Sequence, residues 1–103
     1  MDDAVILTPD LARAARAFTK VSPKTIAEGA GLTRDEVRNF ERGKADLEEA
    51  QKARLVESLE KYGALFIPED EEAGYGVRRK FTRTTLKRLN TWEGEGGQPQ
   101  PAD

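Results

Sequence analysis

The ionisable side chains of this protein limit the chemistry that it can perform. The sequence contains 17 lysines and arginines and 19 aspartates and glutamates, but no histidine and no cysteine. The commonest general base and the commonest zinc ligand are therefore missing, and no disulfide can form. What remains is the chemistry of carboxylates, which can act as acids or bind cations, and of cationic side chains, which can bind anions.

The acidic residues do not show the pattern of a catalytic or metal site. Adjacent pairs, such as Glu48 with Glu49 or Asp70 with Glu71, point most of their side chains apart and lack the buried setting that acid catalysis needs. The acidic run at 69–72 does not match the spacing of a calcium-binding loop, so only weak binding of a divalent cation is conceivable there. We therefore expect no enzyme, no small-molecule substrate, no metal ion and no cofactor.

Positive charge is concentrated in two stretches, although the whole chain has a formal net charge of −2. Residues 20–44 contain six basic and four acidic residues, and residues 74–92 contain six basic residues and no acid. Between them, residues 45–73 contain nine acids and three bases. The two basic stretches can form one positive face if folding brings them together. The alternative is that these charges are ordinary solvated surface.

Two helices are expected before residue 31. Thr8-Pro9 and Ser22-Pro23 are typical helix starts, because the hydroxyl accepts from a free amide and proline suits the first helical turn. Gly31 ends the second helix, since glycine readily adopts a left-handed backbone conformation. The first helix is expected to turn Arg13 and Arg16 away from an apolar face made of Leu11, Ala14, Ala15 and Phe18.

Two further helices are expected after Gly31. Thr33 and Glu36 form a capping box, in which each side chain bonds to the backbone amide of the other residue, so a third helix covers about residues 33–42. Asp46 and Glu49 show the same pattern and predict a longer fourth helix up to about residue 62. The apolar positions of the fourth helix are Leu47, Ala50, Leu55, Val56 and Leu59.

Five residues at fixed spacing predict that the second and third helices form a helix-turn-helix. Ala27 lets the two helices approach each other, Gly31 and Leu32 form the turn, and Val37 and Phe40 pack the third helix onto the second. In such units the second of the two helices is the one that reads DNA. The alternative is an ordinary helical bundle in which the glycine is coincidental.

Beyond residue 62 the pattern changes from helix to strand. Residues 64–67 are an apolar run too short for a helix, and residues 77–81 are typical of a second strand after an acidic loop at 69–76. These strands form either a hairpin or a pairing with a partner subunit. The expected divisions are a helix-turn-helix domain at 1–62, a hairpin or dimerisation strands at 63–81, a basic extension at 82–92 and a disordered tail at 93–103.

The longest apolar runs have four residues, so no segment is expected to cross a membrane. The N-terminal Met-Asp-Asp lacks the basic start of a secretory signal. We therefore expect a cytoplasmic protein.

The most distinctive part of the sequence runs from Ser22 to Lys44. It reads Ser-Pro-Lys-Thr-Ile-Ala-Glu-Gly-Ala-Gly-Leu-Thr-Arg-Asp-Glu-Val-Arg-Asn-Phe-Glu-Arg-Gly-Lys, and the stretch Phe40-Glu41-Arg42-Gly43 is its most telling piece. This segment resembles the XRE (Cro/CI-like) family of transcription regulators, whose members typically show Ser-Gln-x-x-Leu-Ala-x-x-Ala-Gly-Val-Ser and then Ile-x-x-Phe-Glu-x-Gly. The resemblance covers residues 8–59, and residues 60–81 are more weakly similar to short bacterial regulators of this kind.

The resemblance implies that the third helix docks in the major groove of double-stranded DNA. Its early residues would then face the base edges, where arginine pairs well with guanine and asparagine with adenine. The residues implied to read bases are Arg34, Asp35, Arg38 and Asn39. The residues implied to bind phosphates, which hold position but read no sequence, are Lys24, Thr33, Arg42 and Lys44.

Two departures from the family pattern affect these expected contacts. Pro23 stands where members have a glutamine that commonly touches phosphate, so one anchor is missing. Asp35 and Glu36 place negative charge on the edge that would approach DNA. Glu36 is explained by its capping box with Thr33, whereas Asp35 either favours the helix dipole or accepts a hydrogen bond from cytosine. If neither acid is accommodated, the family member has shifted toward protein binding.

The basic segment at 77–88 lies beyond the usual core of the family. Arg78, Arg79 and Lys80 can form an arm that follows the DNA phosphate backbone and adds salt-dependent affinity. They can instead form a charged edge strand that resists aggregation, or they can pair across a dimer axis.

Together these patterns predict a mainly α fold, in which a four-helix Cro/CI-like helix-turn-helix domain precedes a short two-stranded β element and a disordered tail. The expected function is sequence-specific DNA binding by a small transcription regulator. A homodimer on a two-fold-related site is expected, because the core of so short a chain is modest and because the family resemblance implies it. Two alternatives stay open: a protein-binding adaptor that uses residues 46–60 and the hairpin, and an antitoxin that represses its own operon.

Overall fold

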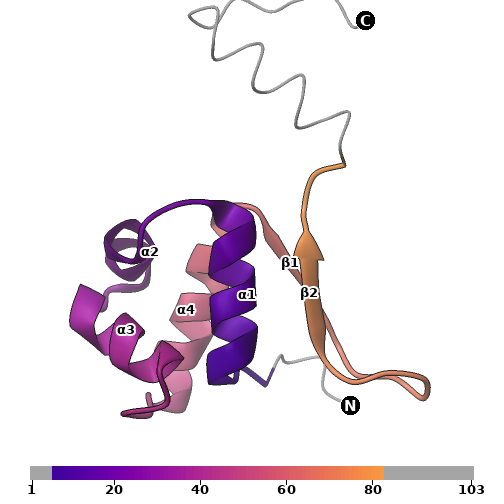
Figure 1. Ribbon diagram of the computed structural model, residues 1–103, viewed down its shortest axis with the longest axis horizontal. Helices are drawn as coiled ribbons and strands as arrows, with labels where there is room; N and C mark the ends of the chain where they lie inside the picture. Colours follow the sequence, from indigo (N-terminus) through magenta and orange to yellow (C-terminus); the bar gives the residue numbers. More distant parts are fainter. Residues whose placement is uncertain (1–5, 83–103) are drawn as a thin grey trace, which may run out of the picture.

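The computed structural model describes residues 6–82, which form four helices followed by a two-stranded sheet (Figure 1). The elements are α1 (Pro9–Thr19), α2 (Pro23–Ala30), α3 (Arg34–Glu41), α4 (Glu49–Lys61), β1 (Ala64–Ile67) and β2 (Gly76–Arg79). The mainly α class and the predicted order of elements are confirmed. Most of the basic extension predicted at 82–92, and the whole tail predicted at 93–103, lie outside the described residues.

The first three helices begin where the capping residues predict. The Thr8 side chain accepts from the backbone amide of Leu11 at 3.4 Å, and the Ser22 side chain accepts from that of Thr25 at 3.2 Å. At α3 the predicted capping box is complete. Glu36 N donates to the Thr33 hydroxyl at 3.0 Å, and Thr33 N donates to the Glu36 carboxylate at 2.8 Å. The sequence signals therefore identify these three starts correctly because the caps are local contacts.

The predicted start of the fourth helix is wrong. The Asp46 carboxylate does not cap α4; it lies 3.2 Å from the Lys52 ammonium. The helix begins at Glu49, with Glu48 as its N-cap residue, and the Glu48 amide donates to the Gln51 side chain at 2.8 Å. Glu48 and Gln51 therefore form the capping box that the sequence pattern assigned to Asp46 and Glu49. Ala50, expected to be one of the apolar positions that pack inward, is exposed.

A single core connects the helices with the inner face of the sheet. Its largest fully buried side chains are Phe40, Ile26, Leu55, Leu59 and Val37. Burial of these side chains is the main stabilising contribution available to so small a domain. Among the described residues, no helix is long and apolar enough to cross a membrane.

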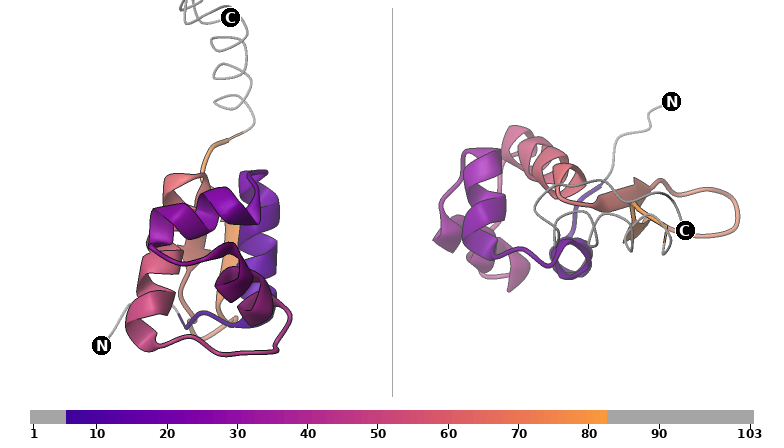
Figure 2. Two further views of the ribbon diagram at one scale, coloured as in Figure 1. Left: turned by 90° about the vertical axis from the view of Figure 1, so that its left-hand side faces the viewer. Right: turned by 90° about the horizontal axis from the view of Figure 1, so that it is seen from above.

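Helix α1 lies between α3 and the sheet, and it contacts both (Figures 1 and 2). Ala15 is buried as predicted, but Ala12 is the second buried residue of this helix and Ala14 is exposed. Phe18 is half-buried, with the Arg79 guanidinium 5.0 Å from its ring centre. The predicted apolar face is wrong at Ala14 and omits Ala12, but Leu11 packs on the core as expected, and α1 contacts neighbours on more than one side.

The two strands pair with each other in one chain, so the predicted hairpin is present. They run antiparallel, with Leu65 opposite Arg78 and Phe66 opposite Val77. Strand β2 covers Gly76–Arg79, which is shorter and begins one residue earlier than the predicted 77–81. Ala64 and Phe66 are buried, and Leu65 and Ile67 are exposed. The hairpin therefore has an inner face against the helices and an outer face in solvent.

Gly29 allows close contact between α2 and α4. Replacement of Gly29 by alanine tests how tightly the two helices pack. A Cβ atom at residue 29 would lie 2.6 Å from the Ser58 hydroxyl, which donates to Ile26 O at 2.8 Å in a buried position. We expect Gly29→Ala to lower the free energy of unfolding by about 1 kcal/mol, although alanine is ordinarily the better helix former. Urea denaturation followed by circular dichroism measures this change.

Two further variants check this explanation. Gly74→Ala, where a Cβ atom meets nothing within 4 Å, should leave stability unchanged. In a Ser58→Ala background, Gly29→Ala should cost little further stability, since the colliding hydroxyl is absent. If Gly29→Ala stabilises the protein, then the contact between these helices is looser than described.

Candidate nucleic-acid interface

The turn between α2 and α3 has the geometry that the five spaced residues predict. Gly31 has a left-handed backbone conformation, with φ of +70°, and its N–H donates to Glu28 O at 3.2 Å. The next amide, of Leu32, donates to Ala27 O at 2.9 Å. Leu32 itself is buried. The turn thus holds the two helices at a fixed angle, and α2 and α3 form a helix-turn-helix arrangement.

The four residues expected to read bases all lie on α3. Arg34 and Asp35 are exposed, whereas Arg38 and Asn39 are half-buried. Because residues four apart lie one above the other on a helix, Arg34 and Arg38 form one row and Asp35 and Asn39 form the next. Val37 and Phe40 are buried on the inner side of the same helix. Packing of those two residues therefore turns the polar rows outward.

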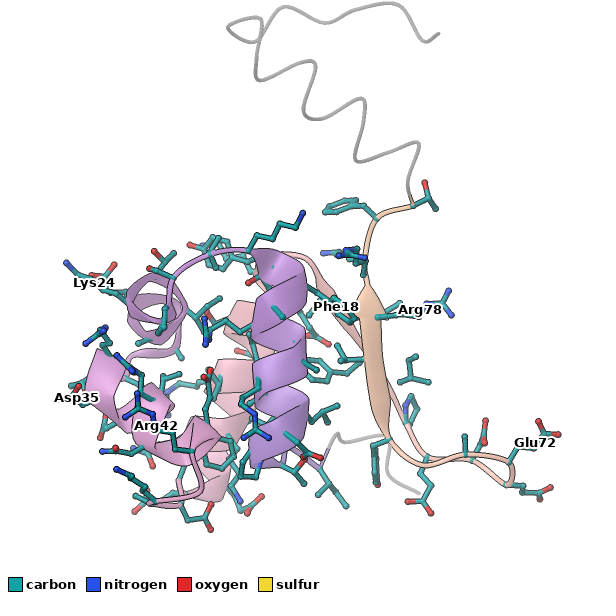
Figure 3. All side chains as sticks on the ribbon, in the orientation of Figure 1. Phe18, Lys24, Asp35, Arg42, Glu72 and Arg78 are labelled. Atoms are coloured by element: carbon teal, nitrogen blue, oxygen red, sulfur yellow. The ribbon has the colours of Figure 1, made fainter. Side chains whose placement is uncertain are left out.

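The cations expected to bind phosphates flank this surface. Lys24 lies in the first turn of α2, Arg42 is the C-cap residue of α3, and Lys44 follows it. All three are exposed, and Figure 3 shows Lys24 and Arg42 on the same side of the molecule as Asp35. None of the three forms an ion pair within residues 6–82. Their charges are therefore available to a ligand on this side.

The two acids near the start of α3 have different surroundings. Glu36 is held by the backbone amide of Thr33, so its carboxylate is explained by the capping box. The Thr33 hydroxyl accepts from Glu36 N and retains its own O–H as a donor. Asp35 lies in the first turn, where the helix dipole favours a negative charge. Its side chain is exposed and points outward.

Glu41 is the residue of this region that sequence reasoning missed. Its side chain is buried, and it accepts from Arg16 Nε at 2.8 Å and from Arg16 Nη2 at 3.0 Å. Arg13 also donates to the backbone carbonyl of Glu41. The hydrogen bonds with Glu41 raise the pKa of Arg16 above its ordinary value. The two arginines of α1, expected to point elsewhere, therefore fasten the end of α3 to α1.

A signal for this ion pair was present in the sequence, but it was not sufficient. Arg13 and Arg16 are three residues apart and so lie on one side of a helix. Glu41 stands directly beside the buried Phe40, which indicates a position at the edge of the core. Only the packing of α1 against α3 shows that these groups meet.

The cations of β2 do not join the positive surface of α3. Arg78 lies on the other side of the molecule from Lys24 and Arg42, with α1 in between (Figure 3). Arg79 stacks on Phe18, and Lys80 Nζ lies 3.5 Å from Glu60 O. Of the stretches 20–44 and 74–92, the structure therefore does not place Arg78 beside Lys24 and Arg42, whereas Arg79 packs at the end of α1 just before Lys20.

Among residues 6–82, no group of three or more acidic side chains is arranged to hold a metal ion. No protein-family model matches this chain, and no curated protein matches it significantly.

Proposed function

We propose that this protein binds double-stranded DNA in a sequence-specific manner, with α3 in the major groove, and acts as a small transcription regulator. The observation that supports this most strongly is the outward polar face of α3. This face is held by the Gly31 turn and by the burial of Val37 and Phe40. A helix that projects polar side chains from a rigid support can reach base edges.

The charge balance of this surface also supports the proposal. Five cations lie on or beside α3, and they are Lys24, Arg34, Arg38, Arg42 and Lys44. Glu41 does not oppose them, because it is buried in its ion pair with Arg16. Glu36 and Asp35 sit at the helix N-terminus, where the backbone amides partly offset their charge. Glu28, exposed on α2, offsets Lys24, but residues 34–44 still present four cations against these two acids and are locally cationic, although the whole chain has a net charge of −2.

Selection from random double-stranded oligonucleotides tests the function directly. The full chain should enrich a preferred sequence, and binding to that sequence should weaken as salt rises, because phosphate contacts release counterions. Recovery of no preferred sequence would contradict the proposal. It would favour the alternative of a protein-binding adaptor, for which the exposed apolar residues of the hairpin would supply a contact surface.

Asn39→Ala is expected to weaken binding to the selected sequence by about tenfold, because a bidentate contact to a base is lost. The same change should have little effect on binding to random DNA, where phosphate contacts dominate. Fluorescence anisotropy with labelled duplexes measures both affinities.

Arg78→Ala is the control, because Arg78 is an exposed cation on the far side of the molecule from α3 (Figure 3). On a duplex long enough for only one copy of the chain, it should change neither the affinity nor its dependence on salt. If Asn39→Ala leaves specific binding unchanged, then α3 does not read the bases as proposed. If Arg78→Ala alone weakens binding, then DNA also contacts the hairpin.

A further inference from the structure

The outer face of the hairpin carries apolar side chains that no described residue covers. Leu65 is 41% exposed and Ile67 is 36% exposed, while their neighbours on β1 are buried. Two other large hydrophobic residues are comparably exposed among residues 6–82. Ile6 lines a shallow depression together with Tyr75 of the hairpin loop, and Phe81 follows β2. The depression is otherwise lined by Thr8 and residues of α1, so it lies on the helix side of the loop, and the outer face itself is formed by Leu65 and Ile67.

The same face has charges of opposite sign at its two ends. Arg78 lies opposite Leu65 in the register, so both side chains are on the outer face near the base of the hairpin. At the tip, residues 69–72 are four consecutive acids, all exposed. Figure 3 shows Arg78 and Glu72 on the same side of the molecule, away from the helices. The outer face is therefore cationic at the base, apolar in the middle and anionic at the tip.

The acidic tip is an ordered loop and not a loose run of charges. The Asp70 carboxylate accepts from the backbone amides of Glu72 at 2.8 Å and of Ala73 at 2.9 Å. These two bonds hold the pKa of Asp70 below its usual range. The Asp70 amide also donates to Ala73 O at 2.9 Å. The turn is thereby closed, and the charges of Glu69, Glu71 and Glu72 are presented to solvent.

We propose that this outer face binds a second copy of the chain, with the two hairpins packed face to face in opposite directions. A two-fold axis between them places the base of one hairpin against the tip of the other. Leu65 and Ile67 of each copy then cover Ile67 and Leu65 of its partner. Arg78 of each copy meets the acidic tip of the other, so each favourable contact occurs twice.

The charge pattern favours a second copy over an unrelated partner. A surface that is positive at one end and negative at the other is its own complement when reversed, which an isologous pair requires. The apolar patch is small, because only two side chains form its centre. Interfaces of this size are weak, so we expect a dimer in equilibrium with the monomer.

This arrangement has a consequence for the position of α3. Lys24, Asp35 and Arg42 lie on the side opposite the hairpin, so pairing through the hairpin places the two α3 surfaces at the outer ends of the dimer (Figure 3). The two helices then face away from each other. They cannot enter neighbouring grooves on one face of a straight duplex, as a two-fold-related site requires. If the proposed function holds, the dimer joins two separate DNA segments.

Sedimentation velocity over a dilution series of the full chain, without DNA, tests the pairing. The wild-type chain should shift from monomer to dimer as concentration rises, and Ile67→Ser should raise the dimer dissociation constant by about tenfold or more. Circular dichroism should show unchanged helix content, since Ile67 is outside the core. A wild-type chain that stays monomeric at every concentration would overturn the proposal. The same result is expected if the chain's own segment 83–103 covers this face, and the proposal is then equally wrong.

Charge reversal tests the orientation of the two hairpins. Arg78→Glu should raise the dissociation constant by about tenfold, because attraction becomes repulsion at two symmetric places. Arg34→Glu is the matched control, an exposed arginine on α3, and should leave the dimer unchanged. Adding Glu69→Arg and Glu71→Arg to Arg78→Glu should restore pairing. If Arg78→Glu has no effect, or if the reversal of the tip does not rescue it, the antiparallel arrangement is wrong.

These measurements contain no DNA, so the failure of one proposal does not imply the failure of the other. Loss of sequence preference with an intact dimer would remove the DNA-binding function alone. A monomeric protein that still selects one DNA sequence would remove the hairpin pairing alone.

Discussion

Phe40→Ala is expected to lower the free energy of unfolding by about 4 kcal/mol, the largest effect of a single substitution that we predict. Phe40 is the largest of the fully buried side chains and is 2% exposed. Truncation removes its apolar area from the core and leaves a cavity that the surrounding helices cannot fill completely. Because small domains are only marginally stable, this loss is a large part of the total. Urea denaturation followed by circular dichroism measures it.

Phe81→Ala is a matched control, since the same side chain is removed at a position that is 36% exposed. Its effect on stability should be less than about 1 kcal/mol, in line with substitutions outside the core. If both variants lose similar stability, the burial of Phe40 is not what holds α3 to the other helices. A further consequence concerns function: Phe40→Ala should weaken DNA binding in proportion to the unfolded fraction, with binding by the folded fraction largely retained.

Arg16→Ala is expected to lower the free energy of unfolding by about 3 kcal/mol, because it leaves the carboxylate of Glu41 without a partner in a buried position. The Glu41 side chain is 7% exposed, whereas that of Arg16 is 29% exposed. Partial exposure of the arginine places the effect at the lower end of the range for buried pairs. Thermal or urea denaturation near neutral pH measures the change.

The double variant with Arg16→Met and Glu41→Leu separates the unpaired charge from other causes. Replacement of both partners by apolar residues of similar volume removes the buried charge, so stability should return to within about 1 kcal/mol of the wild type. Arg42→Ala, at an exposed arginine that forms no ion pair within residues 6–82, should have almost no effect. If Arg16→Ala is also neutral, the contact between α1 and the end of α3 does not hold α3 in place.

The same ion pair links stability to the proposed DNA surface. It removes the charge of Glu41 from the side of α3 that also carries Arg38 and Arg42. It also fixes the C-terminal end of α3, while the Thr33 capping box fixes the N-terminal end. A recognition helix held at both ends can present its side chains at constant positions, which direct reading of bases requires.

Several features of this protein were predictable from neighbouring residues alone. The starts of α1, α2 and α3 depend on Thr8, Ser22 and Thr33, whose side chains bond to amides three residues away. The turn at Gly31 depends on a backbone conformation that glycine adopts without strain. The spacing of Ala27, Val37 and Phe40 predicted which sides of α2 and α3 are buried. All of these contacts join residues close in the chain or follow helical periodicity, so sequence patterns report them well.

The contacts between distant residues could not be predicted in this way. The two packed sides of α1 depend on which elements are its neighbours. The pairing of Arg16 with Glu41 joins residues 25 apart, and the hydrogen bond from Ser58 to Ile26 joins residues 32 apart. No local pattern encodes such distances, because they result from how amphipathic helices share one core.

The separation of the two basic stretches likewise depends on contacts between residues that are distant in the sequence. Their charges follow from composition, but whether they share a surface depends on where α1 lies. In the folded chain α1 stands between α3 and β2 and holds Arg78 away from Lys24 and Arg42 (Figure 3). The sequence thus specified the helices, the caps of α1, α2 and α3, and the residues available for contact. Packing decided which charges share a surface. Because α1 is packed between α3 and the sheet, charges on α3 and on β2 must lie on opposite sides of it.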